Sequence, residues 1–524
     1  MAYNALLPLL VVALGALVGV LLEALVPRRH RFVTQAWFTA VIIVVALVRV
    51  IMNWKTSSTR VLAGNMSVSL DNATLIVWAG LLLFALGSVV LMAQRFGGVS
   101  SFTPMAVSAP GSSDERAAEA VGSEHTEIFP LMLFSLTGML LFPAATDLLT
   151  AFIGLEVLSL PLYLMTALAR RRRLLSHEAA LKYFLLGAFS SAIFLYGAAL
   201  TYGFAGGADY SAIDKALGLG LDRQPLMLAG FALLMVGLLF KVGAVPFHAW
   251  VPDVYTGAPT PLTAYMAVGT KVAAFGALIR VLYVAFGGLA WTWTVPLGIV
   301  AALTMGLGAV FGLTQTNIKR LMAYSSIAHA GFVLAPIAAA VAVTTVGVLN
   351  SMTAAVYYLA SYGLATLGAF AVIMLVRDGT GEAPDLASWA GLGRRHPWVA
   401  AAMTLFLCSL AGIPATAGFI GKLDAFIVAW RGGLAWLVIL GLVFSLVALG
   451  FYMRIVLVMW FGKVSIERAA ADSTDIAAEQ PSDVVKVPVS LAILLALCAA
   501  ATLVGGLVPN YFTHLASLAG QMLR

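Results

Sequence analysis

Charge is scarce in this sequence. Only 10% of its 524 residues are Asp, Glu, Lys or Arg, whereas 61% are hydrophobic and the mean hydropathy is +0.99. A soluble globular domain carries about 25% charged residues, so this scarcity excludes a water-soluble fold. Windows of about twenty apolar residues recur along the chain instead, each long enough to cross the hydrocarbon of a bilayer as a helix.

Other absences narrow the class further. Strict alternation of polar and apolar residues is missing, which argues against an outer-membrane barrel. The two cysteines, Cys408 and Cys498, have neither metal-site nor redox spacing, and no dinucleotide-binding glycine pattern occurs. Much of the net charge of +7 lies in short loops, so it does not indicate a nucleic-acid partner. We therefore predict an all-α polytopic membrane protein that lies in a lipid bilayer.

Hydropathy predicts about fourteen transmembrane helices. Their expected ranges are 5–26, 34–53, 74–94, 128–145, 147–169, 175–202, 226–247, 259–285, 293–314, 321–343, 346–376, 398–430, 434–461 and 487–509. Two polar connections, 95–127 and 463–486, are expected to form surface loops.

Basic residues gather in alternate loops and predict the orientation. They are Arg28, Arg29 and Arg31, then Arg170 to Arg173, Lys319 with Arg320, and Arg394 with Arg395. By the positive-inside rule these loops are cytoplasmic, so both termini are predicted on the outer side. Because residues 1–26 lack a basic stretch before their apolar run, we expect a first helix there and not a signal peptide.

Two segments are interrupted by Gly and Pro close to a lysine. They are Lys241–Pro246 in the seventh expected helix and Gly412–Pro414 in the twelfth. Paired broken helices are typical of inverted-repeat transporters, although membrane helices also tolerate Gly and Pro without such a role. We predict two inverted five-helix repeats, helices 4–8 and 9–13, with helices 7 and 12 broken. The expected divisions are 1–127, 128–285, 293–461 and 462–524.

Five ionisable residues lie inside expected spans: Glu156, Lys182, Lys241, Lys271 and Lys422. Burying five charges in a bilayer costs on the order of 12–17 kcal/mol, and folding in lipid does not require them. Burial favours the neutral form of lysine, whereas arginine stays protonated. Because the deep basic positions are mostly lysines and the arginines are concentrated in loops, the pattern favours a proton route.

Glu156 and Lys182 are expected to form an ion pair. Each is about a dozen positions from the turn at Arg170 to Arg173, and helices rise about 1.5 Å per residue, so the two residues should lie at one depth. The alternative is a static pair that only holds two helices together. A buried ion pair stabilises poorly compared with apolar packing, which favours a functional role.

The other candidates lie at helix interruptions or deep inside spans. Lys241 precedes Pro246, which disrupts the helix and predicts a wet cavity. His248 follows seven residues later, either as a relay member or as an interfacial histidine. Lys271 is near the centre of the eighth span, too deep to reach the interface easily.

Two further candidates have stronger structural alternatives. Lys422 precedes Asp424 near the expected outer surface and could be interfacial. His329 follows Ser325 and Ser326 by about a turn and could be a core histidine with satisfied hydrogen bonds. Glu23 and Arg280 are expected to be anchors at helix ends, and Arg454 is expected to pair with a carboxylate that the sequence does not identify.

Several stretches resemble a known family. They are Gly154–Pro161, Leu239–Pro261, Lys271–Phe275, Ser325–Gly331 and Gly412–Lys422. Over roughly 128–460 the chain resembles subunit N of bacterial NADH–quinone oxidoreductases, respiratory complex I, within the wider family of Mrp-type antiporter-like subunits. The run Asp253–Pro261 looks like subunit N and not its siblings, and Lys422 stands where the sibling M subunit is expected to carry a glutamate.

The resemblance implies a proton-translocating subunit in a bacterial inner membrane. Its proton pathway would comprise Glu156, Lys182, Lys241, His248, Lys271, His329 and Lys422. Flavin, iron–sulfur clusters and quinone would be bound by other membrane and peripheral subunits, with no cofactor in this chain. The alternatives are a subunit of a cation/proton antiporter, a membrane scaffold whose charges only stabilise assembly, and a stand-alone solute transporter.

Overall fold

The computed structural model describes most of the chain. It covers residues 3–56, 61–63, 66–96, 99–102, 112–114, 117, 125–219, 224–341, 349–378, 381–462 and 483–519. In chain order the elements are α1 (Tyr3–Leu25), α2 (Arg28–Thr56), β1 (Val61–Ala63), β2 (Val68–Leu70), α3 (Asn72–Met92), β3 (Arg95–Phe96), β4 (Val99–Ser100), α5 (Ile128–Ala144), α6 (Leu148–Thr166), α7 (Arg173–Ala205), α8 (Tyr210–Gly218), α9 (Gln224–Val242), α10 (Trp250–Gly257), α11 (Thr260–Tyr265), the π-helix η1 (Met266–Thr270), α12 (Lys271–Arg280), the π-helix η2 (Val281–Ala285), the 3₁₀ helix η3 (Gly287–Leu289), α13 (Ala290–Thr314), α14 (Ile318–Ala338), α15 (Ser351–Leu375), β5 (Val376–Asp378), β6 (Gly381–Glu382), the 3₁₀ helix η4 (Leu386–Trp389), α16 (Leu392–Arg395), α17 (Pro397–Ala411), α18 (Ala417–Arg431), α19 (Ala435–Phe461), β7 (Asp483–Val484), α21 (Val489–Leu507) and α22 (Pro509–Leu518).

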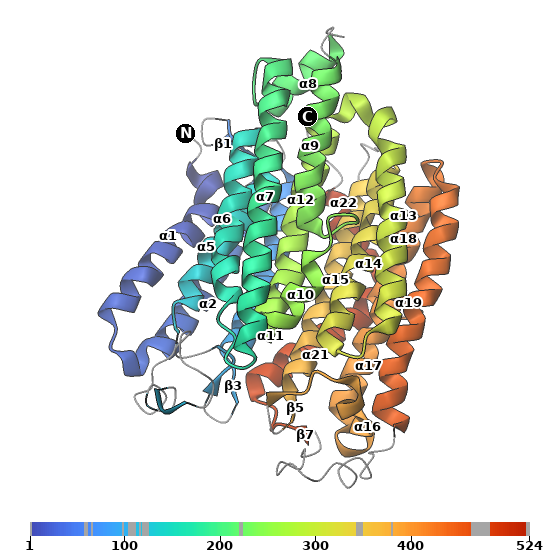
Figure 1. The fold of residues 1–524 in the computed structure, drawn as a ribbon. Coiled ribbons are helices and arrows are strands. Elements are labelled where there is room, and N and C mark those ends of the chain that lie inside the picture. The colour runs from blue at the N-terminus through green and yellow to red at the C-terminus, as the bar shows by residue number, and fades with distance from the viewer. Residues whose placement is uncertain are drawn as a thin grey trace.

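The protein is a bundle of long apolar helices (Figure 1). Among the described residues, twelve helices are long and apolar enough to cross a membrane, and α5 and α17 are shorter apolar helices. The predicted class, an all-α polytopic membrane protein, is confirmed. The division into two inverted repeats stays a prediction.

Two predicted spans are shorter or divided in the structure. The seventh ends at Val242, and residues 243–249 lead without regular helix into α10. The twelfth, expected as one helix over 398–430, is divided into α17 and α18 around residues 412–416. Both interruptions coincide with the Gly and Pro residues that predicted them. Pro lacks the N–H that a helix needs, and glycine accepts the positive φ observed at Gly243 and Gly412.

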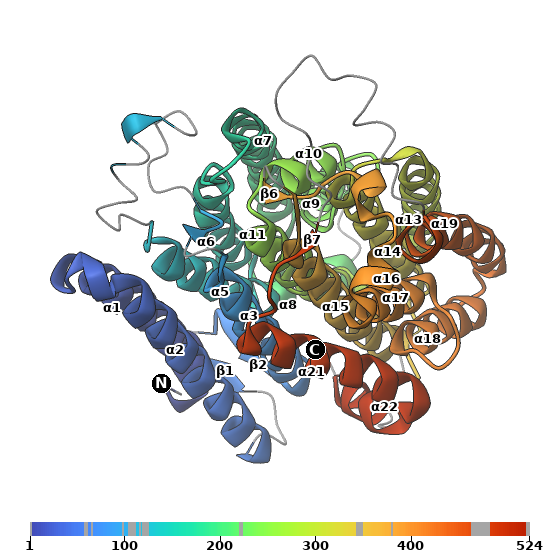
Figure 2. The same ribbon diagram turned by 90° about the horizontal axis from the view of Figure 1, so that it is seen from below.

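The helices at the centre are the most completely buried, and they include the buried Lys271 and His329. In the segments Thr260–Ala285 and Ile318–Ala338, 94% of the most apolar window is buried inside the protein, against 28% in α1 and α2. Viewed along the bundle, α15 lies inside it, whereas α1 and α2 form one edge and α18 and α19 form the other (Figure 2). The lipid bilayer explains this arrangement, because polar groups at membrane depth need hydrogen-bond partners that only protein can supply.

The strands β3 to β7 and the arginine-rich turns gather at one end of the bundle, whereas β1 lies at the other end (Figure 1). β3, β5, β7 and α16 lie at the lower end in Figure 1, while both chain ends are marked near the upper end. β5 pairs with β6 and β7 in a small antiparallel sheet. Of the predicted surface loops, only the hairpin β3–β4 and short pieces belong to the described residues; 103–111, 118–124 and 463–482 lie outside them.

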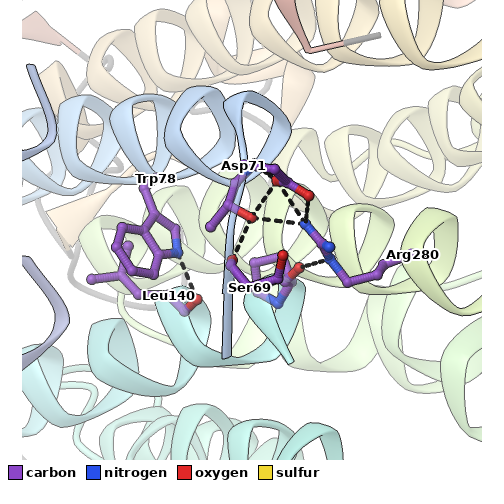
Figure 3. A network of polar contacts seen from close by, with 7 residues as sticks. Ser69, Asp71, Trp78, Leu140 and Arg280 are labelled. Carbon is purple, nitrogen blue, oxygen red and sulfur yellow. Dashed lines mark hydrogen bonds and ion pairs between the residues drawn. The ribbon is translucent and has the colours of Figure 1, made fainter. Parts of the chain in front are cut away.

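Arg280 forms a buried ion pair that ties three helices together (Figure 3). Its Nη2 donates to the two carboxylate oxygens of Asp71 at 2.9 and 3.0 Å and to Thr74 Oγ1 at 2.7 Å, and its Nε donates to Pro143 O at 2.7 Å. Asp71 also caps α3 by accepting from Thr74 N at 2.8 Å. Only 1% of Arg280 is exposed, so the predicted anchor at the end of α12 is an internal clamp to α3 and α5.

The other two charged residues at span edges also have partners. Glu23 accepts hydrogen bonds from Arg31 Nη1 at 3.1 Å and Gln35 Nε2 at 3.0 Å. Arg454 donates to the backbone carbonyls of Leu313, at 2.8 Å, and Gln315. Among the described residues Arg454 has no carboxylate partner, and the free carbonyls at the C-terminus of α13 accept its hydrogen bonds instead.

Candidate proton-transfer site

Lys241 lies in the last turn of α9, directly before the helix break. Its Nζ donates a hydrogen bond to Ser159 Oγ of α6 at 2.6 Å. The ammonium group also lies 5.8 Å from the ring centre of Tyr163 and 5.6 Å from that of Tyr183, within the range of cation–π attraction. Because only 3% of Lys241 is exposed, its charge is stabilised by a hydroxyl group and aromatic rings in place of bulk water.

Glu156 supplies the negative charge of this region. It precedes Ser159 by three residues on α6, and residues at this spacing share a helix face. Its carboxylate acts electrostatically on Lys241, and its Oε1 is buried without a hydrogen-bond partner among the described residues. A buried acceptor without a donor costs free energy. This oxygen is therefore available to accept a hydrogen bond, for example from water.

The predicted ion pair between Lys182 and Glu156 is wrong. Lys182 Nζ binds Glu178 Oε1 at 2.6 Å and Asp253 Oδ2 at 2.8 Å, and 43% of its side chain is exposed. The next residue, Tyr183, is the one that turns inward and is fully buried. The rise per residue gives the depth of a side chain but not its face, and successive helical residues point about 100° apart.

Asp253 was not predicted as a functional residue and was named only as the start of the family motif Asp253–Pro261. It lies in the first turn of α10 and binds Lys182 of α7 together with Arg320 Nη1 of α14, the latter at 3.1 Å. It therefore connects three helices next to the break after α9. The spacing of four residues between Glu178 and Lys182 was a readable signal that Lys182 has a partner on its own helix.

At the break after α9, side chains form hydrogen bonds with backbone groups that lack helical partners. Val245 N donates to Thr304 Oγ1 of α13 at 3.0 Å, and Phe240 O accepts from Trp250 Nε1 at 3.0 Å. Non-helical backbone at membrane depth requires such partners. His248 is half-buried in this break, and its Nδ1 is buried without a hydrogen-bond partner among the described residues.

Lys271 occupies the centre of the bundle, directly after the π-helix η1. Its Nζ donates to the backbone oxygen of Ser326 in α14, and its charge lies 5.7 Å from the ring centre of Tyr362. The hydroxyl of Ser326 is in turn hydrogen-bonded to Tyr362 at 2.9 Å and to Tyr255 at 3.2 Å. π-Helical turns are frequent at functional sites. A lysine that is 4% exposed thus lies beside a small hydroxyl network.

His329 lies next to this network, with its ring centre 5.0 Å from that of Tyr362. Its Nδ1 is 2.8 Å from the hydroxyl of Tyr358, and its Nε2 is 3.1 Å from that of Tyr452. The imidazole also interacts electrostatically with both Lys271 and Lys422. His329 has the hydrogen bonds of a satisfied core histidine, and it also interacts with two buried lysines, so both predicted alternatives for His329 remain open.

Lys422 lies in α18, beside the second helix break. Its Nζ donates to Ala411 O and to Ser445 Oγ, both at 2.8 Å, and lies 4.8 Å from the ring centre of Phe332. A Cβ on Gly412, whose φ is +84°, would lie 2.8 Å from Lys422 Cδ. The side chain is therefore packed against the break and enclosed by protein, which argues against the interfacial alternative.

The structure divides the predicted residues into two groups. Glu156 acts on Lys241 in the first group, and Lys271, His329 and Lys422 share a second electrostatic neighbourhood. In the part of the chain that the structure describes, no side-chain hydrogen bond joins the two groups directly. A proton that passes between them needs water or side-chain movement. Lys182 and His248 lie near the first group without bonding to it.

Comparisons with known proteins identify the family. A family model described as "NADH:quinone oxidoreductase/Mrp antiporter, TM" matches residues 145–448, a range that contains every predicted pathway residue. The chain is 46% identical to NADH-quinone oxidoreductase subunit N of Cutibacterium acnes, across 100% of this chain and 96% of that relative. It is 48% identical to subunit N of a Nocardioides species, across 100% and 98%. The chain belongs to the subunit N family.

A solved structure of respiratory complex I has a chain with the same fold. A chain of respiratory complex I from Thermus thermophilus with bound aureothin is 31% identical, with a TM-score of 0.73, over 96% of this chain and 98% of that one. The resemblance predicted over 128–460 therefore extends to nearly the full length of the chain. It includes the first three helices, which have few specific motifs.

Proposed function

We propose that this member of the subunit N family translocates protons across the membrane as part of an NADH–quinone oxidoreductase. The observation that carries the proposal is the environment of Lys241, Lys271 and Lys422. Each is at most 5% exposed, each lies in a membrane-spanning bundle, and each donates to hydroxyl or carbonyl oxygens. Such lysines are costly to keep charged in lipid and can exchange protons with neighbouring groups.

The proposed pathway begins at Glu156 and Lys241. The carboxylate stabilises the ammonium group, so a change in the charge or position of Glu156 makes Lys241 release its proton. The proton then passes through water to Lys271, whose neighbours Ser326 and Tyr362 can donate and accept hydrogen bonds. His329 carries it on towards Lys422.

Lys182 and His248 are proposed to act at the edge of this pathway. Lys182 holds Asp253 at the start of α10, immediately after the break, and so positions the segment that contains His248. The half-buried imidazole of His248 is placed where water reaches the interruption. In this arrangement both residues connect Lys241 to its surroundings without belonging to the central hydroxyl network.

We further propose that the redox chemistry takes place in other subunits. Flavin, iron–sulfur clusters and quinone would be bound by the membrane and peripheral partners, and electron transfer there would alter the electrostatics at Glu156. The chain would lie in the bacterial inner membrane with its arginine-rich end in the cytoplasm and both termini outside. The gathering of Arg170, Arg171, Arg394 and Arg395 at one end supports this orientation.

The alternative function is that of a subunit in a cation/proton antiporter, which the description of the family model also includes. The relatives with 46% and 48% identity over the full chain are named as subunit N of NADH-quinone oxidoreductases, which favours the first function. Co-purification of this chain with NADH:quinone activity, as opposed to sodium-dependent proton exchange, discriminates between the two.

The decisive experiment replaces Lys271 by Met in the assembled complex, reconstituted into proteoliposomes. We expect proton flux through this subunit to fall by roughly tenfold or more, the order of effect of removing a positioned acid–base group. The measurement is the ratio of protons translocated to NADH oxidised, followed with a pH-sensitive dye. Lys215→Met is the matched control, because Lys215 is exposed in α8, outside the spans.

Each outcome of this experiment has a definite meaning. If Lys271→Met assembles and pumps with the wild-type ratio, the proposal is wrong. If instead the variant fails to assemble while Lys215→Met assembles, the scaffold alternative gains support. Lys271→Arg then decides between them, because it keeps the charge but cannot release the proton.

A further inference from the structure

A cavity lies at the arginine-rich end of the bundle, between segments that are distant in sequence. It has a volume of about 170 Å³ and is formed by the β3–β4 hairpin, the α6–α7 turn, the α10–α11 turn, the start of α14 and the β5–β6 hairpin. The charged residues in its lining are Arg170, Arg171, Arg172, Lys319, Arg377 and Glu382. A single carboxylate thus faces a cluster of basic groups in this lining.

Arg377 and Ser101 give the cavity unused hydrogen-bonding capacity. Arg377 Nη1 and Ser101 Oγ are both buried and have no hydrogen-bond partner among the described residues. The guanidinium group of Arg377 is held over the ring of Phe96, 4.9 Å from its centre. Leaving such groups buried without partners costs free energy, which a bound acceptor would recover.

The one acid in the lining does not neutralise the cluster. Glu382 accepts a hydrogen bond from Thr260 Oγ1 and acts electrostatically on both Lys319 and Arg377. Lys319 is buried and donates to Ala258 O at 2.7 Å, so its charge is fixed at the cavity wall. The lining therefore carries five basic groups against one acid, and although Asp378 also acts electrostatically on Arg377, positive charge is in excess.

The side chain of Arg171 packs closely against the β5–β6 hairpin. Gly381, in the β5–β6 hairpin, has a φ of +134°, and a Cβ at this position would lie 2.9 Å from Arg171 Cδ. Arg171 therefore packs against a hairpin that is about two hundred positions away in sequence. The positive-inside rule alone does not require such packing, since Arg394 and Arg395 satisfy the rule as exposed residues of α16.

We propose that this cavity binds a phosphate-bearing anion. The planar guanidinium group donates parallel N–H bonds that match the oxygens of a phosphate, and several such groups around one cavity suit a multiply charged anion. Two sources carry this chemistry: a free phosphate compound of the cytoplasm, or the headgroup of an anionic phospholipid. Basic pockets between membrane helices on the cytoplasmic side are known to take lipid headgroups.

The test uses the purified, assembled complex with Arg377→Gln and, as matched control, Arg394→Gln. One arm measures the binding of radiolabelled pyrophosphate to complex in nanodiscs of phosphatidylcholine. The other arm counts phosphatidylglycerol and cardiolipin retained per complex after delipidation, by mass spectrometry. We expect one of these ligands to bind at least about tenfold more weakly to Arg377→Gln, the cost of a lost charged hydrogen bond, and equally to the control.

The outcomes separate the sources and expose a failure of the proposal. Loss of pyrophosphate binding identifies a free anion, and loss of retained phospholipid identifies a headgroup. If Arg377→Gln does not assemble, Arg171→Gln replaces it. If wild-type complex binds neither ligand, or both variants bind as tightly as wild type, the proposal is wrong. It is also wrong if cross-linking from the cavity captures an acidic segment of a partner subunit in its place.

Discussion

Lys241 and Lys422 lie in different halves of the chain, each buried beside a break in a membrane-spanning helix. Both donate to a serine hydroxyl, Ser159 at 2.6 Å and Ser445 at 2.8 Å, and both lie near an aromatic ring. They differ in their other partners. Lys241 is under the influence of the Glu156 carboxylate, whereas Lys422 donates to the fixed carbonyl of Ala411.

This difference bears on where the proposed pathway would be controlled. A carboxylate can change its charge or move, so Glu156 can alter the charge of Lys241 when the surrounding complex changes. A backbone carbonyl keeps its dipole, so Lys422 has a constant environment unless α17 and α18 themselves move. The first half of the chain is therefore suited to receive a signal, and the second half to pass a proton on.

The two internal arginines repeat the contrast. Arg280 is fully buried and pairs with Asp71, whereas Arg454 is half-buried and donates to carbonyls at the end of α13. In a dry interior, loss of either partner of an ion pair leaves the other charge buried without compensation. A half-buried guanidinium group that donates to carbonyls can replace some of its hydrogen bonds by hydrogen bonds to water. The clamp around Arg280 is thus more sensitive to the loss of a single charge than the contacts of Arg454 are.

The largest effect that we expect on stability is that of Asp71→Asn. Removing one partner of a buried ion pair leaves an uncompensated charge and costs about 3–5 kcal/mol. The matched change, Arg454→Gln, removes hydrogen bonds from a charged group and costs about 1.5–3 kcal/mol. Both are measured as the midpoint of thermal unfolding of the purified complex, followed by tryptophan fluorescence. Equal shifts for the two variants would contradict the expected difference between the Arg280 ion pair and the carbonyl contacts of Arg454.

Replacing the glycine at each helix break by alanine should separate two effects: strain in the backbone and displacement of a lysine side chain. Gly243→Ala and Gly412→Ala both force a side chain into positive φ, at a cost of about 1–3 kcal/mol each. The added methyl group reaches Lys422 Cδ in the second case but Val251 in the first. We therefore expect similar losses of thermal stability, and a slower proton flux only for Gly412→Ala. Slower flux in both variants would show that the breaks act on transport in another way.

The two serines offer a smaller, matched comparison. Ser159→Ala removes the hydroxyl that accepts from Lys241, while Ser445→Ala leaves Lys422 with the carbonyl of Ala411. The first change should cost about 1.5–3 kcal/mol, as for a hydrogen bond to a charged group, and the second should cost less. The thermal unfolding midpoint and the proton-to-NADH ratio of both variants test this order. A larger effect of Ser445→Ala than of Ser159→Ala would contradict it.

The smallest effect belongs to the half-exposed cluster around Asp253. Asp253→Asn weakens the ion pairs with Lys182 and Arg320, whose side chains are 43% and 40% exposed. Exposed pairs contribute about 0.2–1 kcal/mol and are screened by salt. We expect a small shift in thermal stability that disappears in high salt. A loss as large as that of Asp71→Asn would show that this cluster is buried by a partner in the assembled complex.

Much of the helix arrangement was predictable from local sequence. Long apolar stretches placed the spans, and Gly243, Pro246 and Gly412 indicated both interruptions, because glycine and proline act on the backbone at their own position. The buried lysines Lys241 and Lys271 were also recognisable, since a charge inside an apolar span has few structural explanations.

The partners of these charges were not predictable in the same way. The assignment of Lys182 to Glu156 failed because equal depth does not determine which helix faces meet. Asp71 was missed as the partner of Arg280 because it is about two hundred positions away and lies just outside a span. Arg454 was assigned a carboxylate although carbonyls at a helix end serve it equally well.

The amino-acid sequence was sufficient to establish the membrane class, the spans and the charges that lipid would not tolerate alone. Those features depend on local composition, because each backbone group in a bilayer must be satisfied within its own helix. Which acid faces which base, and which carbonyl is left free, depended on the rotation of each helix about its axis. Packing against neighbouring helices sets that rotation, so only the assembled bundle determined the pairing of Lys241, Lys422 and Arg280 with their partners.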